Sequence, residues 1–213
     1  MDKKDLYIKE NLPYWHNRSY LPHYENSSLL QMITYRLGDS LPQKVLTRLK
    51  DEPETIEGDE KYRKRIEICL DSGYGSCVLK TDEVAFIVYN TWLFYNGERY
   101  KIHAWVIMPN HIHILFQPLL PFTLSRIVED WKKFSSREIN RLINKKGHLW
   151  NLEYWDRYIR NEAHYKSAVE YIHNNPVKAG LVSVPEEWKW SSYKEYKKNL
   201  EENPDIFKGV IIE

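Results

Sequence analysis

Two histidines separated by a single residue, His111 and His113, are the side chains in this sequence best placed to do chemistry. They follow Pro109-Asn110, which divides two short apolar runs, 100–108 and 111–117. That pattern predicts two strands joined by a tight turn. Because side chains alternate along a strand, both imidazoles face the same way, roughly 7 Å apart, within reach of one metal ion. Paired histidines are also common without a metal, so a further ligand and a reactive group are required.

The segment 167–177 offers both. Its apolar spacing predicts a helix that is capped by Asn161 and runs to about Asn175, where Pro176 is expected to end it, because a residue before proline disfavours the α conformation. Tyr171 and Asn175 lie four residues apart and share one helix face. Asn175 can offer a carbonyl oxygen and Tyr171 a nucleophile, although a packed ring with a hydrated hydroxyl is the alternative for Tyr171. His173 is expected at the surface.

The order of the remaining elements indicates the fold. Periodicity predicts a strand over 29–37, helices starting near 40, 62 and 81, a helix over 123–147 and a strand region over 150–159. The order strand, helices, strand, strand, helix, strand is typical of an α+β fold with a ferredoxin-like, mainly antiparallel sheet and helices packed on one face. We expect one domain, with an irregular arm over 1–28, a catalytic core over 29–182 and a tail over 183–213 that docks on the core.

Composition narrows the functional classes. The chain has 213 residues, 42% of them hydrophobic, and a net charge of +1. One domain with a sizeable core is therefore expected, and any contact with nucleic acid needs a local basic patch. Cys69 and Cys77 do not have the spacing of a zinc or disulfide motif. The N-terminus leads into no long apolar segment, which predicts a cytoplasmic protein without a membrane contact.

Two groups of basic residues are candidates for such a patch. One lies on the helix over 123–147 and the other beside the strand region over 150–159. Either group can contact DNA phosphates, but an ordinary solvated face explains the helical group equally well. The candidate DNA-binding residues are Lys132, Lys133, Arg137, Arg157 and Arg160.

Four segments, in this order, resemble the REP-associated tyrosine transposases, which belong to the single-tyrosine HUH transposases of bacterial insertion sequences. The resemblance extends from about residue 13 to about residue 196. The histidine segment and the tyrosine segment together are specific, whereas either alone is weak. The segments are 15–24 (WHNRSYLPHY), 108–113 (MPNHIH), 150–160 (WNLEYWDRYIR) and 171–181 (YIHNNPVKAGL).

The resemblance implies a transposase-like DNA endonuclease and strand transferase. Such an enzyme cleaves and rejoins single-stranded or hairpin DNA, including palindromic repeat elements, through a covalent 5′-phosphotyrosine. It implies that His111, His113 and Asn175 hold a divalent metal, Mg²⁺ or Mn²⁺, and that Tyr171 is the nucleophile. Because REP-associated relatives can act as monomers, we expect a monomer rather than a dimer that exchanges its tyrosine helices.

Two other functions fit parts of the sequence. Ferredoxin-like sheets also serve as non-catalytic modules that bind single-stranded nucleic acid through exposed aromatic residues. The aromatic pattern of such modules is absent here, whereas the histidine pair and the tyrosine helix are present. An ordinary metal-dependent phosphodiesterase would use water as the nucleophile and leave no protein–DNA adduct.

Overall fold

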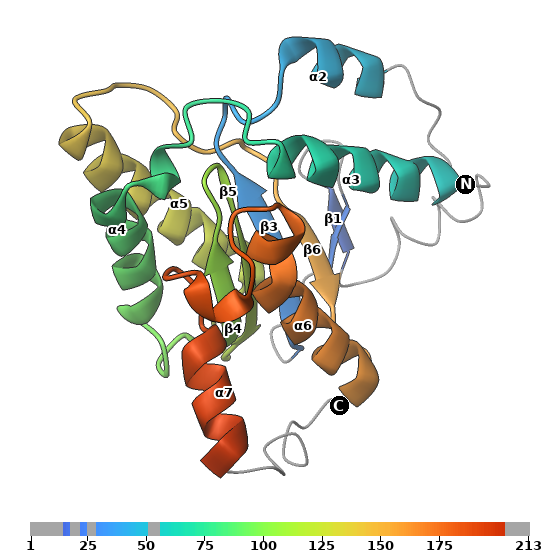
Figure 1. The fold of residues 1–213 in the computed structure, drawn as a ribbon, viewed down its shortest axis with the longest axis vertical. Helices are drawn as coiled ribbons and strands as arrows, with labels where there is room; N and C mark the ends of the chain where they lie inside the picture. Colours follow the sequence, from blue (N-terminus) through green and yellow to red (C-terminus); the bar gives the residue numbers. More distant parts are fainter. Residues whose placement is uncertain (1–14, 18–21, 25–28, 51–55, 203–213) are drawn as a thin grey trace.

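The structure is a computed structural model that describes residues 15–17, 22–24, 29–50 and 56–202. The elements in chain order are β1 (Trp15–Asn17), β2 (Pro22–Tyr24), β3 (Gln31–Arg36), α2 (Gln43–Lys50), α3 (Ile56–Asp71), a short 3-10 turn η1 (Val78–Lys80), α4 (Asp82–Leu93), β4 (Tyr100–Ile107), β5 (His111–Pro118), α5 (Leu124–Leu142), β6 (Trp155–Tyr158), α6 (Glu162–Lys178), η2 (Pro185–Glu187) and α7 (Tyr193–Glu202). Figure 1 shows their arrangement.

A four-stranded sheet in the order β4-β5-β3-β6 forms the centre of the molecule, and every neighbouring pair is antiparallel. The predicted turn joins β4 to β5, where the Met108 amide donates to the carbonyl of His111 at 2.9 Å. Strand β3, the first strand of this sheet along the chain, lies between β5 and β6, as in a ferredoxin-like fold. The predicted α+β class with a mainly antiparallel sheet is confirmed.

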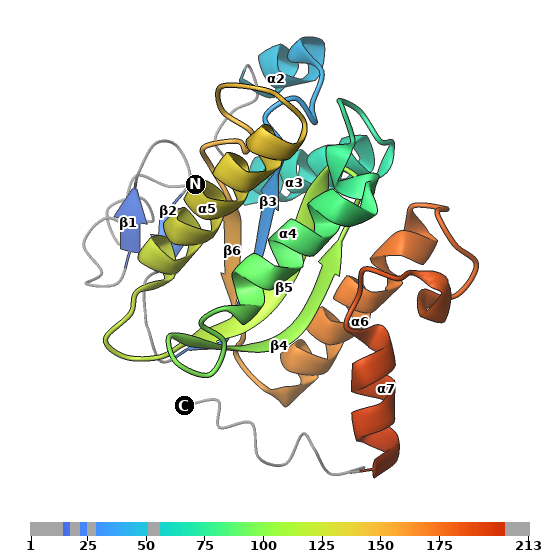
Figure 2. The ribbon, with the colours of Figure 1, turned by 90° about the vertical axis from the view of Figure 1, so that its left-hand side faces the viewer.

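Helices cover both faces of this sheet, as the two views in Figures 1 and 2 show. The larger apolar cluster includes Val88 of α4, Val128 and Trp131 of α5, and one set of strand residues. The second cluster joins Val169 and Ile172 of α6 to the other set. The sequence predicted helices on one face only. Helices α4 and α5 occupy one face and α6 covers the opposite one, because alternate residues of β4 and β5 are apolar in both directions.

This alternation decides where the two histidines point. Ile112, Ile114 and Phe116 of β5 pack toward α4 and α5, whereas Leu115 packs toward α6. His111 and His113 have the same parity as Leu115, so their imidazoles face α6. Both are buried, with 1% and 2% exposure respectively.

Helix α6 starts as predicted but ends later. The Asn161 side chain accepts a hydrogen bond from the His164 amide at 2.8 Å, which caps the helix. Pro176 lies inside α6, which continues to Lys178, so the prediction that the helix ends at Asn175 was wrong. A proline in the final turn interrupts little, because the amide of Gly180 bonds back to the carbonyl of Val177 at 2.9 Å and closes the helix end.

The segments at the two ends of the described chain are more regular than predicted at one end and dock as predicted at the other. The arm was predicted to be irregular, but β1 and β2 pair as antiparallel strands within it; residues 1–14, 18–21 and 25–28 lie outside the described residues. The predicted docking of the tail is observed for its described part, up to residue 202. The Ser192 amide donates to the Trp105 carbonyl at 3.0 Å and the Ile107 amide to the Trp190 carbonyl at 2.9 Å, so the tail continues the sheet beyond β4.

His173 was expected at the surface, but it lies between α6 and the docked tail. It is 3% exposed, and its Nε2 is 2.8 Å from Ser192 Oγ. Its ring also packs against Tyr193 and Tyr196 of α7. The tail therefore covers the face of α6 that carries His173, which was predicted to lie in solvent. In the described part of the chain, no helix is long and apolar enough to cross a membrane.

Candidate active site

The two histidines and the tyrosine suggested by the sequence lie side by side in the structure. The ring centroids of His111 and His113 are 4.9 Å apart, and those of His113 and Tyr171 are 5.2 Å apart. Strand β5 supplies the first two side chains and α6 the third, and α6 packs against β5 of its own chain. A single chain therefore brings these residues together.

Asn110 sets the orientation of His111. The Asn110 Nδ2 group donates to the carbonyls of Leu70 at 3.2 Å and Tyr74 at 2.9 Å. This fixes its Oδ1 as the atom that lies 2.7 Å from His111 Nδ1. Because Oδ1 can only accept, we infer that His111 Nδ1 carries the proton and that Nε2 has the lone pair available for a ligand. Such a partner behind a histidine is the usual support of a metal-binding imidazole.

His113 has an equivalent support. Its Nδ1 lies 2.7 Å from Thr34 Oγ1, on the neighbouring strand β3. Burial, reinforced by the positive charge of Lys178, lowers the pKa of His111 to about 3. Burial also lowers the pKa of His113 well below its usual value, with further contributions from His111 and Lys178. Both imidazoles are therefore neutral near pH 7, which is the protonation state that binds a metal.

Asn175 completes a set of side chains that fits a metal. Its side chain is 1% exposed, and it influences the pKa of both His111 and Tyr171 through side-chain hydrogen bonding. By strict geometry, however, neither its Oδ1 nor its Nδ2 completes a hydrogen bond. A buried amide whose hydrogen bonds are incomplete is costly, and a metal ion would engage its oxygen. Among the described residues no three His, Cys, Asp or Glu side chains gather as a metal site, so the Asn175 oxygen is the third donor that this set offers beside the two histidines.

Helix α3 adds two carboxylates beside Tyr171 that sequence reasoning missed. Burial is the largest cause of the raised pKa of Tyr171, and Glu67 and Asp71 add to it by charge, Glu67 also by a hydrogen bond. The phenol is therefore protonated and has a carboxylate as its hydrogen-bond partner. Glu67 and Asp71 are four residues apart on one helix face, but that spacing alone is too common to indicate a role.

Comparison with known proteins finds a match over the region that contains the two histidines and Tyr171. Residues 92–175 match the family model described as "Transposase IS200 like". A REP-associated tyrosine transposase from Escherichia coli strain K12 is 30% identical over a stretch that covers 44% of this chain and 54% of that protein. The predicted resemblance to the REP-associated tyrosine transposases is confirmed. The chain thus spans about half the length of that relative.

Two further comparisons also find REP-associated tyrosine transposases. A relative from Haemophilus influenzae with the same family description is 29% identical, over 49% of this chain and 69% of that protein. A solved structure of a REP-associated tyrosine transposase bound to a REP hairpin covers 83% of this chain and 84% of its own, with a TM-score of 0.54 and 19% identity. At that identity the likeness concerns the fold.

Lys132, one of the candidates for DNA contact, has its ammonium engaged within the protein. Its Nζ donates to the carbonyls of Asn151 at 3.0 Å, Leu152 at 2.9 Å and Glu153 at 3.3 Å. It also lies 5.3 Å from the ring centroid of Tyr154. This lysine therefore fastens the segment before β6 to α5, a role that sequence spacing does not reveal.

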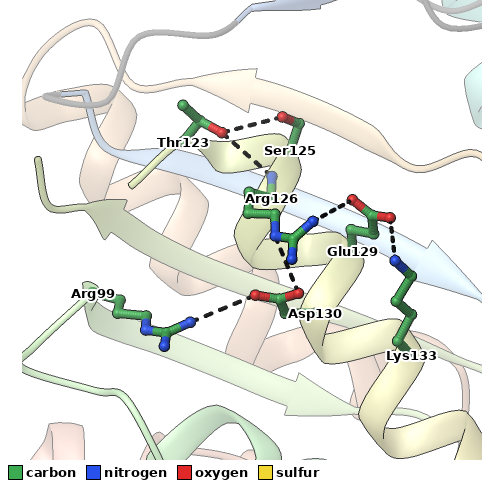
Figure 3. Close-up of polar contacts among 7 residues, drawn as sticks. All are labelled: Arg99, Thr123, Ser125, Arg126, Glu129, Asp130 and Lys133. Atoms are coloured by element: carbon green, nitrogen blue, oxygen red, sulfur yellow. Dashed lines mark hydrogen bonds and ion pairs between the residues drawn. The ribbon is translucent and has the colours of Figure 1, made fainter. Parts of the chain in front are cut away.

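The exposed face of α5 carries its own counter-charges, as Figure 3 shows. Lys133 pairs with Glu129, and Arg126 pairs with both Glu129 and Asp130. Arg137 pairs with Glu138 at 3.0 Å. Helix α5 also packs on the side of the sheet away from the histidines. The structure therefore does not bring Lys132, Lys133 or Arg137 to the histidines and Tyr171.

Arg157 and Arg160, in contrast, lie on the same side of the molecule as α6. Arg157 pairs in register with Met32, which packs in the α6 cluster. Both arginines are exposed, and both lower the pKa of His164 in the first turn of α6. They remain candidates for contacting DNA that approaches this helix.

A cavity of about 590 Å³ lies at the outer edge of β4, between α4 and α7. Its walls include Trp105, Tyr165 and Tyr196, and it shares no lining residue with the site around Tyr171. We therefore assign the candidate active site to the side chains of β5 and α6, which face α3.

Proposed function

We propose that this chain is a DNA endonuclease and strand transferase that works through a covalent 5′-phosphotyrosine on Tyr171. The observation that supports it most is the meeting, within one chain, of Tyr171 with two neutral histidines and the buried amide of Asn175.

The proposed reaction exchanges one phosphate ester for another. The Tyr171 oxygen forms a bond to phosphorus, and the bond from phosphorus to the 3′ oxygen of the preceding nucleotide breaks. Glu67 is the neighbouring carboxylate that can take the phenol proton, and the departing 3′ oxygen acquires a proton to become a hydroxyl. Reversal by a 3′ hydroxyl rejoins the strand without an external energy source.

The side chains around Tyr171 suit a divalent metal, Mg²⁺ or Mn²⁺. The Nε2 atoms of His111 and His113 and the Oδ1 atom of Asn175 would hold it. When bound, such an ion neutralises charge on the phosphate oxygens and makes phosphorus easier to attack. Asn110 and Thr34 would keep the two imidazoles aimed at it.

Single-stranded or hairpin DNA is the proposed substrate class. Support comes from the confirmed resemblance and from the solved relative that is bound to a REP hairpin. Because the candidate site is complete within one chain, a monomer is the proposed active form.

A cleavage assay separates the three classes of function. We expect the protein to cut an end-labelled hairpin oligonucleotide when Mn²⁺ or Mg²⁺ is present and to lose this activity in EDTA. His113→Ala should abolish cleavage while the melting temperature remains close to that of the parent protein. His164→Ala, which changes a partly buried histidine in the first turn of α6, is the matched control and should cut normally.

Two results would contradict the proposal. Binding of the oligonucleotide without cleavage would favour a non-catalytic module. Full cleavage by His113→Ala without added metal would remove the histidine pair from the reaction.

A further inference from the structure

Lys178 shares a face of α6 with the two residues already assigned to the site. Tyr171, Asn175 and Lys178 are spaced four and three residues apart, so their side chains follow one line along the helix. The continuation of α6 past Pro176 is what keeps Lys178 in this line. Its side chain is 50% exposed, whereas Asn175 below it is buried. Lys178 therefore stands at the opening of the site, where a DNA strand would enter.

The ammonium of Lys178 is surrounded by the parts of the site. Its Nζ lies 5.6 Å from the ring centroid of Tyr171. It also lies 3.5 Å from Glu67 Oε2 and 3.6 Å from Asp71 Oδ2, both on α3. Its positive charge reaches both histidines, since it contributes to the lowered pKa of each. The Lys178 ammonium therefore lies near the proposed nucleophile and pairs with the two carboxylates beside it. Its charge also acts on the two histidines proposed as metal ligands.

We propose that Lys178 binds a non-bridging oxygen of the phosphodiester that Tyr171 attacks, and that Glu67 and Asp71 hold its ammonium until the phosphate replaces them. This inference rests on the proposed function and adds to it a residue that receives the substrate. A carboxylate and a phosphate offer an ammonium the same kind of partner, namely an anionic oxygen. The two carboxylates therefore occupy, in the free protein, the position that phosphate oxygens take in the complex.

The exchange of partners costs little. Ion pairs between partly exposed side chains are weak, so a phosphate can displace a carboxylate from the ammonium. Lysine suits this exchange because its ammonium is a compact charge on a flexible stem that can turn from one oxygen to another. A fixed, fully buried pair would resist it, and the half-exposed Lys178 and Glu67 are not such a pair.

A purely structural role is the alternative. On that view, Lys178 only ties α3 to α6, and its removal changes stability without changing how DNA binding responds to salt. A phosphate contact behaves differently, because each one releases counterions and adds about 0.7 to the slope of log affinity against log salt for a single strand.

The test measures binding in a protein that cannot cut. In the Tyr171→Phe background, the affinity for a single-stranded oligonucleotide is measured from low to high salt. We expect Lys178→Gln to reduce the salt slope by about 0.7 and Lys178→Arg to retain it. Lys198→Gln is the matched control, because it removes the same charge from α7, where Lys198 pairs with Glu202 at 3.8 Å, and the slope should stay unchanged.

The carboxylates provide the reciprocal test. Glu67→Gln combined with Asp71→Asn should tighten binding of the same oligonucleotide, because two competing anions are removed. An unchanged slope in Lys178→Gln, or weaker binding in the carboxamide variant, would overturn the inference. Because neither measurement needs cleavage, they are independent of the proposed chemistry, whose failure would show instead as the absence of an adduct on protein that retains Tyr171.

Discussion

Asn110 lies in the turn between β4 and β5 and orients His111, a candidate metal ligand. Its Nδ2 binds two carbonyls near the end of α3 and its Oδ1 faces His111, so one side chain fixes the turn and aims an imidazole. The sequence motif shows an asparagine before a histidine but not which way its amide points. That orientation depends on carbonyls about 40 residues earlier in the chain.

Replacing Asn110 tests this support. Asn110→Ala should weaken Mn²⁺ binding by about 10–100-fold, because outer partners of metal-binding histidines contribute that much. Titration calorimetry with Mn²⁺ measures it. Asn174→Ala, on the exposed side of α6, is the control and should bind Mn²⁺ normally. Equal affinities in the two variants would show that Asn110 does not orient a ligand.

The lowered pKa of His103 should make the stability of the folded protein depend on pH. Burial, with a smaller effect of Lys101, lowers its pKa to about 4 in the folded protein, whereas about 6.5 is expected unfolded. Between these values the unfolded chain binds a proton that the folded chain does not, so the free energy of unfolding decreases as pH falls from 6.5 to 4, by an order of 3 kcal/mol for this residue. Above pH 6.5 this contribution is fully present and constant.

Urea denaturation at pH 7, 5.5 and 4.5 measures this effect. His103→Gln should lose less stability on acidification than the parent protein, and the difference isolates His103 from the other buried histidines. Parallel curves for the two proteins would mean that His103 is protonated in the folded state.

Among the elements, the β4–β5 pair and α6 were largely predictable, and so was the presence of α3, but the position of α3 beside Tyr171 was not. Local periodicity and the Pro-Asn turn define the hairpin, and the Asn161 cap defines the start of α6. The end of α6 was missed, because the penalty of a proline is small when only one turn follows it. The approach of Glu67 and Asp71 to Tyr171 arises from packing between α3 and α6, which no local pattern encodes.

Helix α5 offers a direct comparison of two adjacent lysines. Lys132→Ala should lower the free energy of unfolding by about 2 kcal/mol, because three backbone carbonyls lose a charged donor. Lys133→Ala should change it by less than about 0.5 kcal/mol, because its pair with Glu129 is exposed. Thermal or urea unfolding of both variants checks this, and equal losses would contradict the role given to Lys132.

At the scale of the whole molecule, the site depends on four segments that are distant in sequence. They are β3 with Thr34, α3 with its two carboxylates, β5 with the histidines and α6 with the tyrosine. The sequence indicated two of these four. The sheet order β4-β5-β3-β6 places β3 beside β5, and the contact between α3 and α6 brings the two carboxylates to Tyr171. Within the site, the charge of Lys178 is balanced by the carboxylates of Glu67 and Asp71 on α3.

The most direct test of the account is the site of covalent attachment to DNA. The protein is incubated with a labelled oligonucleotide and Mn²⁺, separated on a denaturing gel, and the adduct is mapped by peptide analysis. We expect attachment at Tyr171 and none in Tyr171→Phe, whereas Tyr158→Phe, a matched change of a nearby tyrosine on β6, forms the adduct normally. Cleavage by Tyr171→Phe at the normal rate, or an adduct on another tyrosine, would contradict the account.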